Sequence, residues 1–143
     1  MKSRRRLTPA LAVALVILSG EKAVVPGGGV APQTLSDRSA PGPPTLNHAI
    51  SGTNSVHLMW SAASNGGSAI SGYRVYRGTQ PGGENLLTPI ATLGNILSYT
   101  DSTADFGFTY YYKVAAVNVV GEGPLSGEKS ASPAALRSPA RQR

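Results

Sequence analysis

Short runs in which apolar and polar side chains alternate fill the middle of the chain, from about residue 45 to about residue 131. Alternation with a period of two predicts strands that have one buried and one solvent-facing side. Glycine, proline, asparagine and serine separate the runs, and no stretch keeps the 3.6-residue period of a helix. The predicted strands cover residues 45–50, 55–60, 70–77, 86–93, 97–100, 108–118 and 125–131. Seven short strands predict an all-β fold, a seven-stranded antiparallel two-sheet sandwich of the immunoglobulin-like kind.

The two sides of these predicted strands separate a candidate core from a candidate surface. The side that carries most of the large apolar and aromatic residues supplies the predicted structural core: Trp60, Tyr73, Val75, Tyr110, Tyr112 and Val114. The opposite side supplies a possible contact surface: Arg74, Tyr76, Tyr111 and Lys113. Exposed tyrosine and arginine favour binding hot spots, although the same pattern is typical of a solvated sheet face. Pro89 interrupts the weakest run and predicts that this strand lies at a sheet edge.

Six segments, in order along the chain, resemble a fibronectin type III domain. The resemblance covers about 90 residues, and each segment alone is short. Together they predict that the domain occupies residues 43–132. The segments are Pro41-Gly42-Pro43-Pro44, Val56-x-Leu58-x-Trp60, Ile70-Ser71-Gly72-Tyr73-Arg74-Val75-Tyr76-Arg77, Ser98-Tyr99-Thr100-Asp101, the run from Tyr110 to Asn118, and the predicted turn Gly121-Glu122-Gly123-Pro124.

The resemblance implies structural roles for two aromatic residues. Trp60 corresponds to the tryptophan between the sheets, and Tyr110 to the tyrosine-corner residue, whose hydroxyl returns to the backbone of the preceding turn. Members of the family usually have Leu-x-Pro-Gly-Thr before that tyrosine, whereas residues 104–108 of this chain read Ala-Asp-Phe-Gly-Phe. We therefore expect different local packing, with Phe106 in the place of the missing leucine.

The N-terminal segment reads as an export signal. Three arginines and a lysine precede an apolar run that ends near Leu18, which is shorter than the roughly 20 residues of a membrane-spanning helix. We expect a signal peptide at residues 1–20, with transient membrane contact, and a flexible Gly/Pro linker at residues 21–42. A disordered basic tail is expected at residues 133–143. An uncleaved signal would instead leave a membrane anchor, with the domain outside.

The distribution of charge argues against a nucleic-acid partner. The chain has a net charge of +6, but residues 43–131 hold four cations and five anions, so the excess positive charge belongs to the ends. A nucleic-acid-binding domain concentrates its cations on the folded surface.

Residue types that carry chemistry are sparse. The chain has no cysteine, which excludes disulfides, thiolate metal sites and cysteine nucleophiles. His48 and His57 are the only histidines, and no Gly-x-Ser-x-Gly or phosphate-binding loop is present. No Arg-Gly-Asp stands between the last two strands. We therefore expect no catalytic residues, no metal site and no cofactor.

These observations favour a non-catalytic, secreted or cell-surface binding or spacer module that contacts an unknown protein or polysaccharide, and we expect a monomer. Domains of the resembled family often stand beside the catalytic modules of secreted bacterial polysaccharide-degrading enzymes. An accessory module of a glycoside hydrolase system is therefore one alternative. A membrane-tethered module with an uncleaved signal is another.

Overall fold

The computed structural model describes residues 37–137. The predicted signal peptide, most of the predicted linker and the end of the tail lie outside the described residues. Eight strands form in sequence order: β1 (Thr45–Gly52), β2 (Ser55–Ser61), β3 (Gly72–Gly78), β4 (Ala91–Leu93), β5 (Ser98–Asp101), β6 (Tyr110–Val117), β7 (Glu122–Leu125) and β8 (Lys129–Ala131).

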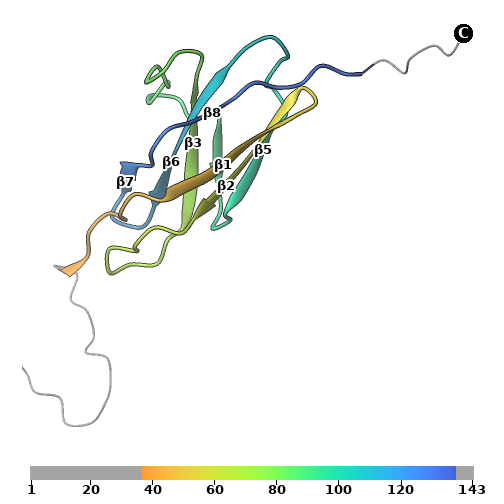
Figure 1. Cartoon of the computed structure of the whole chain (residues 1–143). Coiled ribbons are helices and arrows are strands. Elements are labelled where there is room, and N and C mark those ends of the chain that lie inside the picture. The colour runs from red at the N-terminus through yellow and green to blue at the C-terminus, as the bar shows by residue number, and fades with distance from the viewer. Residues whose placement is uncertain (1–36, 138–143) are drawn as a thin grey trace, which may run out of the picture. The chain divides into compact units, whose positions relative to one another are not determined.

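The strands form two antiparallel sheets that face each other (Figure 1). One sheet has three strands in the order β1-β2-β5. The other has five, in the order β4-β3-β6-β7, with β8 also paired to β6. The two-sheet sandwich expected from the alternating pattern is therefore confirmed. Gly66 and Gly67, in the predicted turn after β2, have φ angles of 62° and 79°, which glycine adopts without strain.

The last predicted strand is divided in two. Both β7 and β8 pair with β6, through Leu125 opposite Ala115 and Lys129 opposite Tyr112. Between them, the Ser126 hydroxyl accepts a hydrogen bond from the N–H of Val114 at 3.0 Å, a donor that strand pairing would otherwise engage. A side-chain oxygen thus takes the place of a backbone acceptor, while the N–H of Ser126 donates to the carbonyl of Val114 at 2.7 Å. The predicted turn also differs, because residues 122–124 belong to β7 and the connection from β6 precedes them.

The fourth strand is much shorter than predicted. Of residues 86–93, only the last three form β4, because Pro89 has no N–H to donate and Leu87 is 95% exposed. The predicted edge position is confirmed, since β4 pairs with β3 alone.

The core lies between the sheets and contains all six predicted core residues. Tyr73, Val75, Tyr112 and Val114 are fully buried, Trp60 is 3% exposed and Tyr110 is 6% exposed. The rings of Trp60 and Tyr73 lie 5.5 Å apart, centroid to centroid, and join the two sheets across the middle of the sandwich. Rings tilted in this way add to the free energy gained by burial alone.

The turn before β6 forms a tyrosine corner, but with different packing. The Tyr110 hydroxyl accepts a hydrogen bond from the N–H of Asp105 at 3.1 Å, as the resemblance implied. The expectation for Phe106 is wrong, because its side chain is 60% exposed, whereas Ala104 is 1% exposed and joins the core. The smaller Ala104 thus takes the inward position of this loop.

Replacing Tyr110 with phenylalanine is expected to reduce the free energy of unfolding by about 1 kcal/mol, because the Asp105 N–H loses its acceptor while the ring remains. Urea denaturation followed by tryptophan fluorescence measures the change. Tyr111→Phe, on the outer side of the same strand, is the control and should unfold at the urea concentration of the unmodified protein. Equal losses in both variants would contradict the role of the corner.

The chain is tied to the sandwich where it enters it. Ser39 and Gly42 each donate a backbone hydrogen bond to the loop after β2, to the carbonyls of Gly66 (2.8 Å) and Ser64 (2.9 Å). The Asn118 side-chain amide, which is 4% exposed, donates to the carbonyls of Ser39 and Asn65. Residues 39–42, which the sequence assigned to the linker, are therefore packed against the domain.

The chain is also held where it leaves the sandwich. The N–H of Ala134 donates to the carbonyl of Gly52 at 2.9 Å, and its carbonyl accepts from Asn54 at 3.1 Å. The start of the predicted tail thus pairs with the turn between β1 and β2, at the end of the sandwich opposite to the point of entry (Figure 1).

Candidate binding surface

The outer side of the five-stranded sheet carries the four residues predicted as a contact surface. Strand pairing places Tyr76 of β3 opposite Lys113 of β6, with Arg74 and Tyr111 at the flanking positions on the same side. The exposure of Tyr76 differs from the prediction: its side chain is only 3% exposed, so a partner could not contact it directly. Its neighbours on this sheet cover it.

A hydrogen-bonded cluster explains why Tyr76 is covered. The Tyr76 hydroxyl donates to one carboxylate oxygen of Glu122 at 2.6 Å, and the Arg74 guanidinium donates to the other oxygen. Burial, followed by the hydrogen bond to Glu122, raises the pKa of Tyr76, which keeps the hydroxyl as a donor. Glu122 was not predicted to belong to this surface, because the sequence pattern places it in a turn rather than on β7.

A second cluster surrounds Lys113 on the same sheet. Its ammonium lies 2.9 Å from a carboxylate oxygen of Glu84, whose side chain is 1% exposed, and 3.6 Å from Glu128. Glu128 also accepts a hydrogen bond from the N–H of Gly82 at 2.7 Å. The hydrogen bond with Glu84 raises the pKa of Lys113, so the ammonium stays charged. Both cations of the predicted surface are therefore neutralised within the domain.

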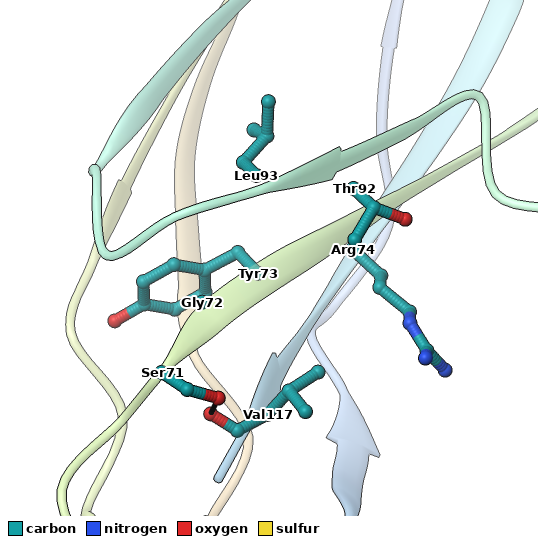
Figure 2. A pocket seen from close by; sticks show the side chains of 7 residues that line it. All are labelled: Ser71, Gly72, Tyr73, Arg74, Thr92, Leu93 and Val117. Atoms are coloured by element: carbon teal, nitrogen blue, oxygen red, sulfur yellow. Dashed lines mark hydrogen bonds between the residues drawn. The ribbon is translucent and has the colours of Figure 1, made fainter.

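A small pocket of about 160 Å³ opens beside the first cluster, near the β4 edge. Its lining residues include Ser71, Arg74, Thr92, Leu93 and Val117. Figure 2 shows the hydrogen bond that joins the Ser71 hydroxyl to the Val117 carbonyl, at 3.1 Å. The pocket has room for a small polar group and presents no carboxylate toward it.

A buried carboxylate lies at the end of the sandwich where β5 ends. Asp101 is fully buried and accepts hydrogen bonds from Arg77 (2.7 Å), Tyr112 (2.9 Å) and the hydroxyl of Thr103 (2.7 Å). The Arg77 guanidinium also lies 4.7 Å from the centre of the Tyr110 ring. Burial alone raises the pKa of Asp101, but the hydrogen bonds from Thr103, Arg77 and Tyr112 outweigh it, so the pKa lies below its ordinary value.

This lowered pKa predicts a loss of stability in acid. A carboxyl with a lower pKa in the folded than in the unfolded protein stabilises the fold above its unfolded value, about 3.9, and the contribution disappears as the pH falls through the folded value. We therefore expect the free energy of unfolding to fall progressively as the pH drops below about 5. Denaturation series over this range measure it, and Asp101→Asn should flatten the dependence. An equally steep dependence in that variant would contradict the assignment.

The remaining candidate chemistry is dispersed. His57 faces outward on the three-stranded sheet and shares a hydrogen bond with the Thr100 hydroxyl at 2.9 Å, while His48 lies on the neighbouring strand. No group of three or more histidine, cysteine, aspartate or glutamate side chains within residues 37–137 could hold a metal ion. Nor does this part of the chain contain a helix with the length and apolar character of a membrane span.

Two curated proteins match the sequence over much of its length. The chain is 40% identical over 97 residues, 67% of its length, to an amylopullulanase from Thermoanaerobacter thermohydrosulfuricus. It is 37% identical over 90 residues, 62% of its length, to exoglucanase B from Cellulomonas fimi. The matched segments are only 6% and 7% of these two proteins, so the chain spans a small part of each.

Among solved structures, an Fn3-like protein from Clostridium thermocellum covers 71% of this chain and 99% of its own, with 28% identity and a TM-score of 0.50. No family model matches the sequence.

Proposed function

We propose that this chain, whose folded part is similar to an Fn3-like protein and to segments of two large enzymes, serves as a non-catalytic accessory module of a polysaccharide-degrading system. The observation that carries the proposal is the match to small segments of two enzymes whose names refer to polysaccharide degradation. A segment that makes up so little of a large enzyme is more readily a module beside the catalytic part than the catalytic part itself.

The described surface supports a non-catalytic role. Glycoside hydrolysis needs two carboxyl groups that flank the scissile bond, about 5 to 9.5 Å apart. In this domain Glu122 is held by Arg74 and Tyr76, Glu84 by Lys113, and Asp101 is buried beneath Arg77. Each of these carboxylates is ion-paired or hydrogen-bonded within the domain, and no aspartate or glutamate lines the small pocket.

Retention of the full chain on insoluble polysaccharides, together with release of soluble sugar, tests this function. We expect the protein to sediment with starch granules or cellulose at a level above that of serum albumin, and to release no reducing sugar. Release of sugar by the purified chain would contradict the non-catalytic role. Sedimentation no greater than that of albumin on every polysaccharide would contradict the accessory role.

We also propose that the chain is exported, because its basic start and short apolar run have the pattern of a signal peptide. Amino-terminal sequencing of the protein from an expressing bacterium tests this. We expect the mature protein outside the cytoplasm to begin after about residue 20. A protein that begins at Met1 in the membrane fraction would instead be a tethered module.

A further inference from the structure

Charged residues are distributed unequally between the two sheets. Residues 39–73 and 85–100 contain no lysine, arginine, aspartate or glutamate. These two stretches supply all of β1 and β2 and all of β5 except Asp101, which is buried. The outer side of the three-stranded sheet therefore carries no formal charge when histidine is neutral, whereas the five-stranded sheet carries Arg74, Lys113 and Glu122.

Strand pairing defines the outward residues of the three-stranded sheet. Met59 of the central strand lies opposite both His48 and Ser98, and His57 lies opposite both Ile50 and Thr100, so these side chains share one side. We call the set of His48, Ile50, His57, Met59, Ser98 and Thr100 the uncharged face. Ile50 is 50% exposed and Met59 is 42% exposed. Apolar groups thus alternate with imidazoles and hydroxyls over a continuous sheet surface.

Such a face is unusual for a solvated sheet. A soluble surface is designed with about 25–35% charged residues, and natural sheets use charges on edge strands to prevent edge-to-edge pairing. The strands β1 and β5 lie at the two edges of this sheet and present no such charge outward. Contact with an uncharged partner would explain why the outward side of this sheet lacks charged residues.

We propose that the uncharged face is the surface on which this domain docks against a neutral polysaccharide, an inference that rests on the proposed function. A neutral glucan offers hydroxyl groups and C–H surfaces but no counter-charge. A lysine or glutamate covered by it would lose water without gaining a partner, which is costly. Hydroxyl and imidazole groups can exchange hydrogen bonds with sugar hydroxyls, while Ile50 and Met59 cover C–H surface.

Part of the polar framework of this sheet is already ordered. The ring nitrogen Nδ1 of His57 is hydrogen-bonded to the Thr100 hydroxyl, and the Asn47 amide donates to the Ser61 hydroxyl at 2.8 Å. Groups that are fixed before binding lose less conformational entropy on contact. Because the uncharged face contains no tryptophan, tyrosine or phenylalanine, each sugar contact is weak, and we expect retention on polymer surfaces rather than on short oligosaccharides.

A second copy of the domain fits this face less well. Eight residues of strand and three strands give a surface of about 26 Å by 14 Å. That is less than half of the roughly 800 Å² that each partner buries in a stable protein interface. A polymer surface does not have this limit, because many domains can lie on it side by side.

Two charge-neutral double variants of the full chain test the face. Ile50→Lys with Met59→Glu places a charge pair on the uncharged face. Thr79→Lys with Ser130→Glu places the same pair at exposed positions of the other sheet, directly after β3 and on β8. We expect the first variant to be retained about tenfold less on starch granules or cellulose, because charges are desolvated without partners. The control should be retained as the unmodified protein is.

Salt distinguishes the two sheets independently. Docking through the uncharged face should be unchanged in 1 M NaCl, whereas docking through the charged clusters should weaken because salt screens exposed charges.

Thermal melts establish that both variants fold. Equal retention of all three proteins, or loss only in the control, would overturn the assignment of the face while leaving the accessory function intact. Failure of the unmodified chain to bind would contradict both. Analytical ultracentrifugation without polysaccharide reports the oligomeric state. A change of oligomeric state in only the first variant, with unchanged retention on the polysaccharide, would indicate a second copy as occupant and overturn the proposal.

Discussion

Replacing Asp101 with alanine is expected to lower the free energy of unfolding by about 3–5 kcal/mol, among the largest losses available to a single substitution in this domain. The change removes the acceptor of the Tyr112 hydroxyl and the carboxylate partner of Arg77, whose remaining acceptor is the Thr103 hydroxyl at 2.9 Å. Tyr112 is fully buried, and the Arg77 side chain is 23% exposed, so water cannot fully replace the lost partner. An isolated buried polar group costs more than a hydrogen bond gains.

Two further variants separate the charge of Asp101 from its position. Asp101→Asn keeps the shape and one acceptor oxygen, so we expect a smaller loss than with alanine. Asp105→Ala, in the following loop, removes an exposed carboxylate and should change the free energy of unfolding by less than about 0.5 kcal/mol. Urea denaturation at pH 7 measures all three variants. A loss in Asp101→Ala no larger than in Asp105→Ala would show that the buried cluster does not stabilise the fold.

Replacing Trp60 with alanine is expected to cost about 3–5 kcal/mol, because it leaves a cavity between the sheets. The side chain is 3% exposed and its ring packs against Tyr73, so neighbouring residues of both sheets lose contacts. Calorimetry measures the change, since the variant loses the natural fluorescence probe. An unchanged melting temperature would contradict the position of Trp60 in the core.

Trp60→Phe is the matched control for this cavity. The indole N–H of Trp60 is buried without a hydrogen-bond partner among residues 37–137, so phenylalanine removes that unpaired donor while it keeps most of the packing. We therefore expect a clearly smaller loss than with alanine. Equal losses in the two variants would mean that ring contacts contribute little at this position.

The period-two alternation was sufficient to predict the sandwich and its core side, because burial of alternate side chains is a local property of a strand. Pro89 was sufficient to predict the edge position of β4. The alternation could not predict that Glu122 reaches Arg74 and Tyr76, or that Glu84 reaches Lys113. Those contacts join residues 46 to 48 and 29 positions apart, and they depend on strand order and register. The alternation also predicted that Tyr76 is exposed, which is wrong. Alternation predicts which side of the sheet a side chain faces, but not whether neighbouring side chains cover it.

The contacts of Asp101 and Asn118, at the ends of the sandwich, could not be predicted from the sequence for the same reason. Asp101 follows a run of strand residues and resembles an ordinary turn acid, and Asn118 resembles an ordinary turn amide. Their partners come from loops distant in sequence, including Ser39 and Asn65 for Asn118. Conversely, Phe106 seemed suited to the core by its type, yet the turn directs it outward and buries Ala104.

The attachment of the chain at both ends has a mechanical consequence. Hydrogen bonds of Ser39 and Gly42 fix the entry at one end, and those of Ala134 fix the exit at the other. The eight residues of β1 between these ends span about 26 Å. A pulling force on the flanking segments would run along the strands and would have to shear rows of backbone hydrogen bonds at once. The domain would then act as a strut, which holds whatever adjoins its two ends at a fixed separation under load.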